Sequence, residues 1–165
     1  MLEAAEALLL RRLLTDQELA SLATLHRGEP AVSMVPYALL DGRHDADGTP
    51  ALLLHVSRLA PHTADLLATP AVGLLVMAPR TPQDNPLALP RLSLQGRALP
   101  CRPEDPAYPA ARAAYLARLP EAEPMFGFGD FTLVRVVPTS ARFVAGFGRA
   151  MALGPAQLAQ VLAAA

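Results

Sequence analysis

The sequence contains no tryptophan, no lysine and only one cysteine among its 165 residues. A single cysteine, Cys101, excludes an intrachain disulfide and a thiolate metal cluster. The four histidines are dispersed, with no third ligand at metal-binding spacing, so we expect no metal site. No apolar run reaches the roughly 18 residues that a membrane-spanning helix needs. These absences exclude disulfide-stapled, zinc-finger and membrane-spanning classes of protein.

Charged residues are also scarce, at 18% of the chain. The net charge is −1. All 14 basic residues are arginines, and they are balanced by 15 acidic residues. Such a balance creates no field that would recruit nucleic acid or an anionic membrane. Glu3 and Glu6 precede the first apolar run, whereas a secretory signal begins with basic residues. We therefore expect no nucleic-acid or membrane partner, and a cytoplasmic location.

The chain is instead rich in apolar residues, which account for 52% of it. A chain of this length suits a single domain, residues 1–165, that buries about two thirds of its unfolded surface. The apolar excess fits a well-filled core, or apolar surface covered by a second copy of the chain. We expect both.

Helix-forming residues predict a helix at each end of the chain, over 2–14 and about 155–164. Two further helices are expected, one from about residue 61 and one over 106–119, with a proline-rich loop over 79–90. Seven apolar or alternating runs separated by glycine and proline turns predict strands: 20–26, 31–40, 51–57, 71–78, 91–99, 130–137 and 141–147. The last two strands are expected to join through a turn at 138–140. Consecutive hairpins with helices set apart favour a mainly β barrel or sandwich over a doubly wound sheet.

The most informative polar segment runs from Ser57 to Thr63, where a strand ends and a helix begins. Ser57, Arg58, His62 and Thr63 place two hydroxyls, a guanidinium and an imidazole at this point. The first turn of a helix offers unpaired amides and the positive end of its dipole, which together bind phosphate. Ser57 and Thr63 could instead serve only as caps of the helix. Both interpretations stay open at this stage.

Two weaker signals accompany this turn. Polar Ser33 interrupts an apolar strand that is bulged at Pro36, since proline lacks an amide donor. Arg91 begins another strand, and a single arginine there is most often a solvated edge charge. Neither signal is sufficient by itself to identify a ligand.

Taken together, these segments resemble the FMN-binding split-barrel superfamily of pyridoxamine 5'-phosphate oxidase-like proteins, and within it the HugZ-type heme-utilisation branch. The matching segments occur in the order of that superfamily and spread over most of the chain. They are SLATL (21–25), GEPAVSMVPYA (28–38), LLLHVSRLAPHTADL (52–66), DNPLALPRLSLQG (84–96), FGDFTLVRVVP (128–138) and ARFVAGFGRA (141–150).

The resemblance implies a split barrel of six to seven mostly antiparallel strands that works as a homodimer, with the ligand in a cleft between subunits. It also implies FMN as the ligand. The phosphate would be held by Ser57, Arg58, His62 and Thr63. The flavin ring would be lined by the strand Ser33, Met34, Val35 and Pro36 and faced by Arg91. A positive group near the ring would stabilise the anionic reduced flavin.

The chain departs from both named activities of this superfamily. It has no C-terminal motif with tryptophan and arginine for the oxidase substrate, so vitamin B6 oxidation is not expected. Heme-binding members supply a C-terminal histidine to the iron, and here no histidine follows His62. Our leading hypothesis is an FMN-dependent oxidoreductase that acts on an unidentified small substrate, with no catalytic residue assigned. The alternatives are a heme-binding or heme-utilisation protein of the HugZ type, and a non-catalytic dimeric cofactor-binding module.

Overall fold

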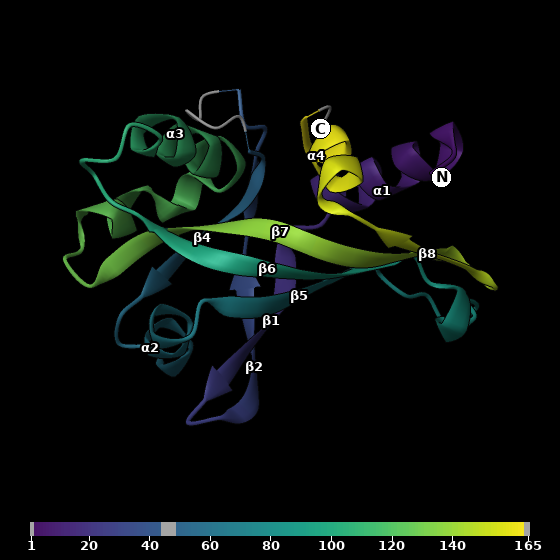
Figure 1. Cartoon of the computed structure of the whole chain (residues 1–165), viewed down its shortest axis with the longest axis horizontal. Helices are drawn as coiled ribbons and strands as arrows, with labels where there is room; N and C mark the ends of the chain where they lie inside the picture. The colour runs from purple at the N-terminus through teal and green to yellow at the C-terminus, as the bar shows by residue number, and fades with distance from the viewer. Residues whose placement is uncertain (1, 44–48, 164–165) are drawn as a thin grey trace.

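The computed structural model describes residues 2–43 and 49–163, and its centre is one curved antiparallel sheet (Figure 1). The strands are β1 (Leu19–His26), β2 (Glu29–Pro36), β3 (Ala38–Leu40), β4 (Ala51–Ser57), β5 (Ala71–Met77), β6 (Arg91–Cys101), β7 (Phe131–Gly146) and β8 (Arg149–Leu153). The helices are α1 (Ala4–Asp16), α2 (Pro61–Ala68), α3 (Tyr108–Arg118) and α4 (Pro155–Ala163), with two short 3-10 helices, η1 (Pro86–Ala88) and η2 (Pro120–Gly127). The mainly β, antiparallel class predicted from the sequence is confirmed, with eight strands in the described residues where six to seven were expected.

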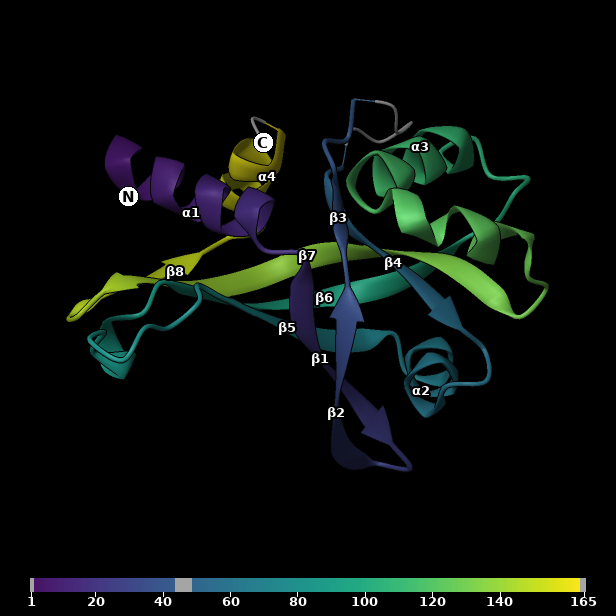
Figure 2. The ribbon, with the colours of Figure 1, turned by 180° about the vertical axis from the view of Figure 1, so that it is seen from behind.

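The sheet bends back toward itself. Its strands follow the order β2-β1-β5-β6-β7-β4-β3, and β8 pairs with β7 beside this path. β2 and β3 therefore lie at opposite ends of the path, yet only Tyr37 separates them along the chain. The two ends can be joined by one residue only if the sheet curls until they meet, which gives a half-open barrel (Figure 2).

Tyr37 marks a break where the sequence predicted one strand over 31–40. Its ring is fully buried, and its hydroxyl donates to the Leu14 carbonyl at 2.9 Å. The Arg118 guanidinium lies 5.6 Å from the centre of the same ring. Pro36 cannot donate to a neighbouring strand, so the break costs no ladder hydrogen bond at that position. Tyr37 thus anchors the junction to α1 and α3.

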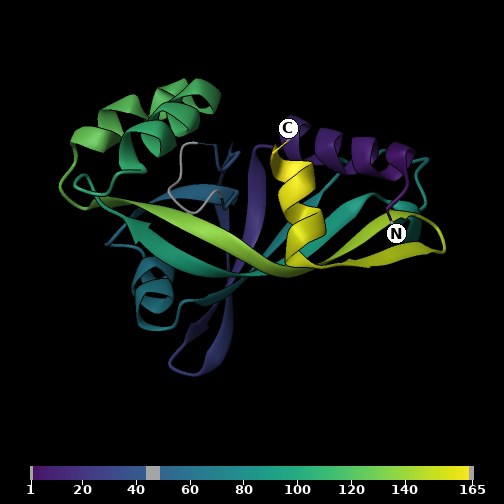
Figure 3. The same ribbon diagram turned by 45° about the horizontal axis from the view of Figure 1, so that its top comes forward.

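The apolar residues form two clusters on opposite sides of the sheet. The larger cluster lies inside the curve and includes residues of α1 and α4, which lie side by side over one end of the sheet (Figure 3). The smaller cluster lies on the outer face of β3 and β4, under α3 and η2. β4 is buried on both faces, because Leu54 and Val56 point inward while Leu53 and His55 point outward. This double burial brings a histidine under the α3–η2 cover.

The predicted turn at 138–140 is wrong, because β7 runs unbroken through it. The strand tolerates Pro138 by pairing it with Gly96 next to a β-bulge at Gln95/Gly96. Thr139 then donates to the Gln95 carbonyl at 3.2 Å, and Ser140 donates to the Gln95 side chain at the same distance. The sequence patterns also missed η2 and β8, whose neighbourhoods are rich in glycine and proline.

We predict that Gly96→Ala destabilises the fold by about 2 kcal/mol, because overpacking in a filled site carries a penalty of this size. An added Cβ would lie 2.8 Å from the Val137 carbonyl oxygen and 2.9 Å from a Val136 methyl carbon. Gly73→Ala is the matched control, since its Cβ would meet Ala23 at an ordinary 3.5 Å. Urea unfolding of both variants gives the comparison, and equal midpoints would contradict it.

Both terminal helices appear where they were expected, although α1 begins and ends two residues later than predicted. In the described ranges, no helix is long and apolar enough to cross a membrane. The cytoplasmic location stays a prediction, as does the single-domain assignment.

Candidate functional site

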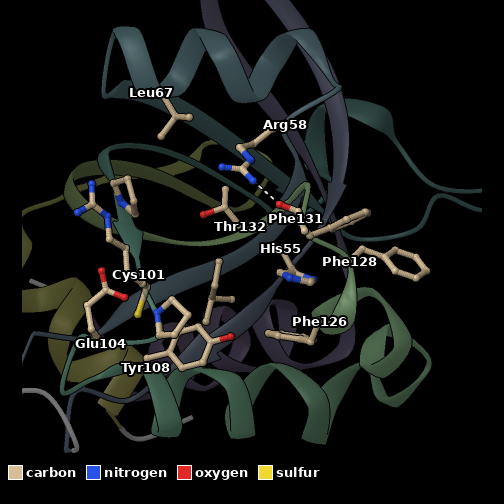
Figure 4. A pocket seen from close by; sticks show the side chains of 15 residues that line it. His55, Arg58, Leu67, Cys101, Glu104, Tyr108, Phe126, Phe128, Phe131 and Thr132 are labelled. Atoms are coloured by element: carbon tan, nitrogen blue, oxygen red, sulfur yellow. Dashed lines mark hydrogen bonds between the residues drawn. The ribbon is translucent and has the colours of Figure 1, made fainter.

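A pocket of about 510 Å³ lies between the outer face of the sheet and the α3–η2 cover (Figure 4). We call it the aromatic pocket, because phenylalanine, tyrosine and histidine rings form much of its wall. Its lining residues are His55, Arg58, Leu67, Pro100, Cys101, Arg102, Pro103, Glu104, Tyr108, Phe126, Phe128, Gly129, Phe131, Thr132 and Leu133.

His55 is the centre of the aromatic wall. Its imidazole is stacked on the Phe126 ring, with 3.8 Å between ring centres and 9° between planes. Phe131 lies 5.1 Å from the imidazole centre, and Tyr115 meets it edge-on at 5.7 Å. Burial, with a smaller contribution from the Arg112 charge, lowers the pKa of His55 to about 4. The imidazole is therefore neutral at pH 7, and its buried Nδ1 has no hydrogen-bond partner.

The lowered pKa of His55 predicts a loss of stability in mild acid. The folded protein takes up this proton only near pH 4, whereas the unfolded chain takes it up near 6.5. The contribution of His55 is thus complete above about pH 6.5 and declines toward pH 4, by roughly 3 kcal/mol in total. Unfolding free energies from pH 7.5 to 4 should fall more steeply for the wild type than for His55→Gln. Parallel curves would contradict this assignment.

The rim of the aromatic pocket carries charge. Arg58, Arg102 and Glu104 are exposed there; Arg58 directly follows β4, and Arg102 directly follows β6. An arginine can grip a carboxylate or phosphate through two parallel hydrogen bonds. An aromatic floor with guanidinium groups at the rim suits a flat apolar molecule that carries anionic groups.

The Ser57–Arg58 turn is tied to the segment before β7. The Ser57 hydroxyl donates to Asp130 Oδ2 at 2.5 Å, and the Arg58 amide donates to the Asp130 carbonyl at 2.6 Å. The Arg58 guanidinium donates to the Gly129 carbonyl. Ser57 Oγ also accepts from the Leu59 amide at 3.1 Å. The turn is therefore held mainly by contacts within the chain.

His62 and Thr63 lie in the first turn of α2. The N-cap residue of this helix is Ala60, no side chain caps the helix, and the Thr63 amide donates to the Ala60 carbonyl at 3.1 Å. The alternative in which Ser57 and Thr63 merely cap the helix is thus wrong. Thr63 is fully buried and its hydroxyl has no partner. His62 is half-buried, and burial lowers its pKa against an opposing effect of Asp65.

The other predicted residues lie apart from this turn. On β2, Ser33 and Val35 face one way, whereas Met34 and Pro36 are exposed on the other face. Arg91 starts β6 and donates to the carbonyls of Leu87 and Leu89. Arg91 pairs with Val144 at one end of β7, while Ser57 pairs with Phe131 at the other end. A single chain therefore does not bring Arg91 to the Ser57 turn, and the FMN roles of all these residues stay a prediction.

Of the predicted site residues, only Arg58 lines the aromatic pocket. Sequence reasoning missed His55, Phe126, Phe131, Arg102 and Tyr108. One signal was visible in the sequence: the phenylalanine-rich segment GFGDF (127–131), which overlaps the family-matching segment 128–138.

Comparison with known proteins shows which family of β-barrel proteins the chain matches. Residues 2–158 match the model of the CREG β-barrel family. A chloroplastic heme oxygenase of a non-standard type (HOZ) from Arabidopsis thaliana is 40% identical over 132 residues, which cover 80% of this chain and 37% of that protein. These matches confirm the resemblance to a heme-utilisation branch that the sequence segments indicated.

Two solved structures show the same fold. A heme-binding protein from Mycobacterium smegmatis superposes with a TM-score of 0.80 at 30% identity, covering 97% of this chain and 62% of that one. A pyridoxamine 5'-phosphate oxidase-type protein from Listeria innocua superposes with a TM-score of 0.56 at 15% identity, covering 85% and 98%. The second likeness shows the split-barrel fold alone. The chain spans less than two thirds of the length of the Arabidopsis and Mycobacterium proteins.

Proposed function

The chain belongs to the CREG β-barrel family, and from this premise we propose that it binds heme in the aromatic pocket. The observation that carries the proposal is the pocket itself, which combines a stacked aromatic wall at His55 with guanidinium groups at its rim. Heme is flat and apolar and carries two carboxylates, so it matches both parts. The names of the Arabidopsis and Mycobacterium relatives support the same ligand class. This replaces FMN, our leading expectation from sequence.

The residues of the pocket suit this group. Phe126 and Phe131 would exclude water from the macrocycle, and Arg58 and Arg102 would bind its carboxylates. The neutral imidazole of His55 adds a nitrogen without adding charge to the apolar wall. Bound heme supplies electron-transfer and oxygen chemistry, which the protein tunes through its surroundings.

Titration with hemin, followed by visible absorption, tests the proposal. We expect saturation at one hemin per chain, with a sharpened Soret band. A linear rise without saturation, as given by hemin adsorbed to any apolar surface, would exclude a specific site.

FMN binding, with an oxidoreductase activity on a small substrate, is the competing function, and it requires that the turn from Ser57 to Thr63 accept a phosphate. The observation in its favour is the first turn of α2, which has no side-chain cap and which Arg58 precedes closely in sequence. Unpaired amides at a helix start are suited to a phosphate. Quenching of FMN fluorescence by the purified wild-type chain is the measurement that would support it.

We further propose that two copies of the chain pair through an exposed apolar face of the β1–β2 hairpin. This hairpin face consists of residues that lie opposite one another in the strand register: Leu19, Ser21, Ala23, Leu25, Pro30, Val32, Met34 and Pro36. It holds no charged residue, so it can meet its own copy across a two-fold axis without like-charge repulsion. The dimer is compatible with either ligand, and with a binding module that has no catalytic role.

A further inference from the structure

The turn predicted to hold a phosphate already holds an anion that belongs to the chain. Asp130 precedes β7, and its carboxylate accepts the Ser57 hydroxyl proton at 2.5 Å. Its carbonyl oxygen accepts from the Arg58 amide at 2.6 Å, and the neighbouring Gly129 carbonyl accepts from the Arg58 side chain. Two successive residues of one segment therefore occupy the polar groups of the turn.

The one proton that the Ser57 hydroxyl can donate is committed to Asp130. The hydroxyl oxygen also accepts from the Leu59 amide. A phosphate brought to this turn would find no hydroxyl proton, and it would meet a carboxylate of the same sign. A phosphate beside an aspartate is disfavoured by like-charge repulsion and by desolvation.

The other groups of the turn do not compensate for this repulsion. Thr63 is fully buried, so its hydroxyl is closed to a ligand. Burial lowers the pKa of His62, which favours its neutral form at pH 7. The chain contains no lysine that could add a point charge. Arg58 is the one predicted phosphate ligand in the turn that combines a permanent charge with exposure.

We propose that Asp130 is a specificity-determining residue that excludes a phosphate-bearing flavin from the Ser57–Arg58 turn. The exclusion of FMN stands on the contacts of Asp130 alone. The consequence that this chain binds heme in place of FMN rests on the proposed function. A carboxylate-bearing macrocycle held at the rim of the aromatic pocket does not require the Ser57 hydroxyl.

The test compares two flavins on two variants. Asp130→Asn removes the charge and keeps an acceptor for Ser57, whereas Asp130→Glu keeps the charge. We expect Asp130→Asn to bind FMN at least about tenfold more tightly than the wild type. The free energy of one hydrogen bond to a charged group corresponds to a change in affinity of at least this size. Asp130→Glu should show no gain. Riboflavin has the same ring and no phosphate, so its affinity should be unchanged in both variants.

Either of two results would overturn the proposal. One is that folded Asp130→Asn binds FMN no better than the wild type. The other is an equal gain for riboflavin, which would mean that the substitution opened the ring site and not the phosphate site. Thermal unfolding of each variant reports whether it is folded. Hemin titration of the wild type is scored separately, so that a failure of heme binding is distinguished from a failure of phosphate exclusion.

Discussion

Replacing Arg58 and Arg102 together by glutamine should weaken hemin binding at least about 100-fold, because two charge-assisted hydrogen bonds of roughly 1.5–3 kcal/mol each are lost. Both side chains line the aromatic pocket, Arg58 from the turn after β4 and Arg102 from the segment after β6. Glutamine keeps most of the length and polarity of arginine, so the change isolates the positive charge. Absorption titrations of the double variant and the wild type give the ratio of dissociation constants.

The first control for this experiment is a ligand that lacks the carboxylates. The dimethyl ester of hemin has no carboxylates, so it should bind the wild type and the double variant equally. A second double variant, Arg12→Gln with Arg80→Gln, removes the same charge from exposed positions outside the pocket. It should bind hemin as the wild type does. An equal loss in both double variants would point to net charge and not to the rim of the pocket.

Placing Glu at both Val32 and Met34 should convert a dimer into a monomer, with a rise of at least about 1,000-fold in the dimer dissociation constant. The two side chains are among the most exposed apolar groups of the chain, at 71% and 63%. They lie on one face of β2, so a two-fold axis through that face would bring four carboxylates together. Like charges opposed in an interface cost several kcal/mol. Sedimentation equilibrium measures the dissociation constant.

The matched control places Glu at Leu8 and Leu87, which are exposed apolar residues on α1 and η1. This variant adds the same charge away from the hairpin face and should remain dimeric. A wild type that is monomeric at micromolar concentration would refute the dimer directly. Monomer formation by the control alone would move the interface away from the hairpin face.

The sequence predicted the fold more successfully than the site. Alternation and turn residues located most of the strands, because each strand has one face in the core and one outside. The breaks were harder to predict. β7 continues through Pro138 beside a bulge, where Gln95 pairs with Ser140 and the next residue, Gly96, pairs with Pro138. The sequence of β7 alone does not reveal this register with β6.

The site was harder for a related reason. Ser57 and Arg58 were recognised as a polar pair at the end of a strand, but their partner Asp130 is 73 residues away from Ser57 along the chain. Because the Asp130 carboxylate accepts from the Ser57 hydroxyl, the turn already holds an anionic group of the chain. His55 looked like an ordinary strand residue, since local sequence does not show that β4 is covered on both faces. These features depend on which strands become neighbours, and on where α3 and η2 come to lie.

The central claim is that heme binds in the aromatic pocket, and paramagnetic broadening in a proton–nitrogen NMR spectrum tests it most directly. Ferric hemin broadens nearby amide signals, whereas the zinc porphyrin binds without doing so and serves as the reference. We predict that hemin, added at one equivalent, erases the amide signals of residues 101, 102, 104 and 126–133, with little effect on the hairpin face. Broadening centred on residues 19–36, or spread evenly over the surface, would contradict the account.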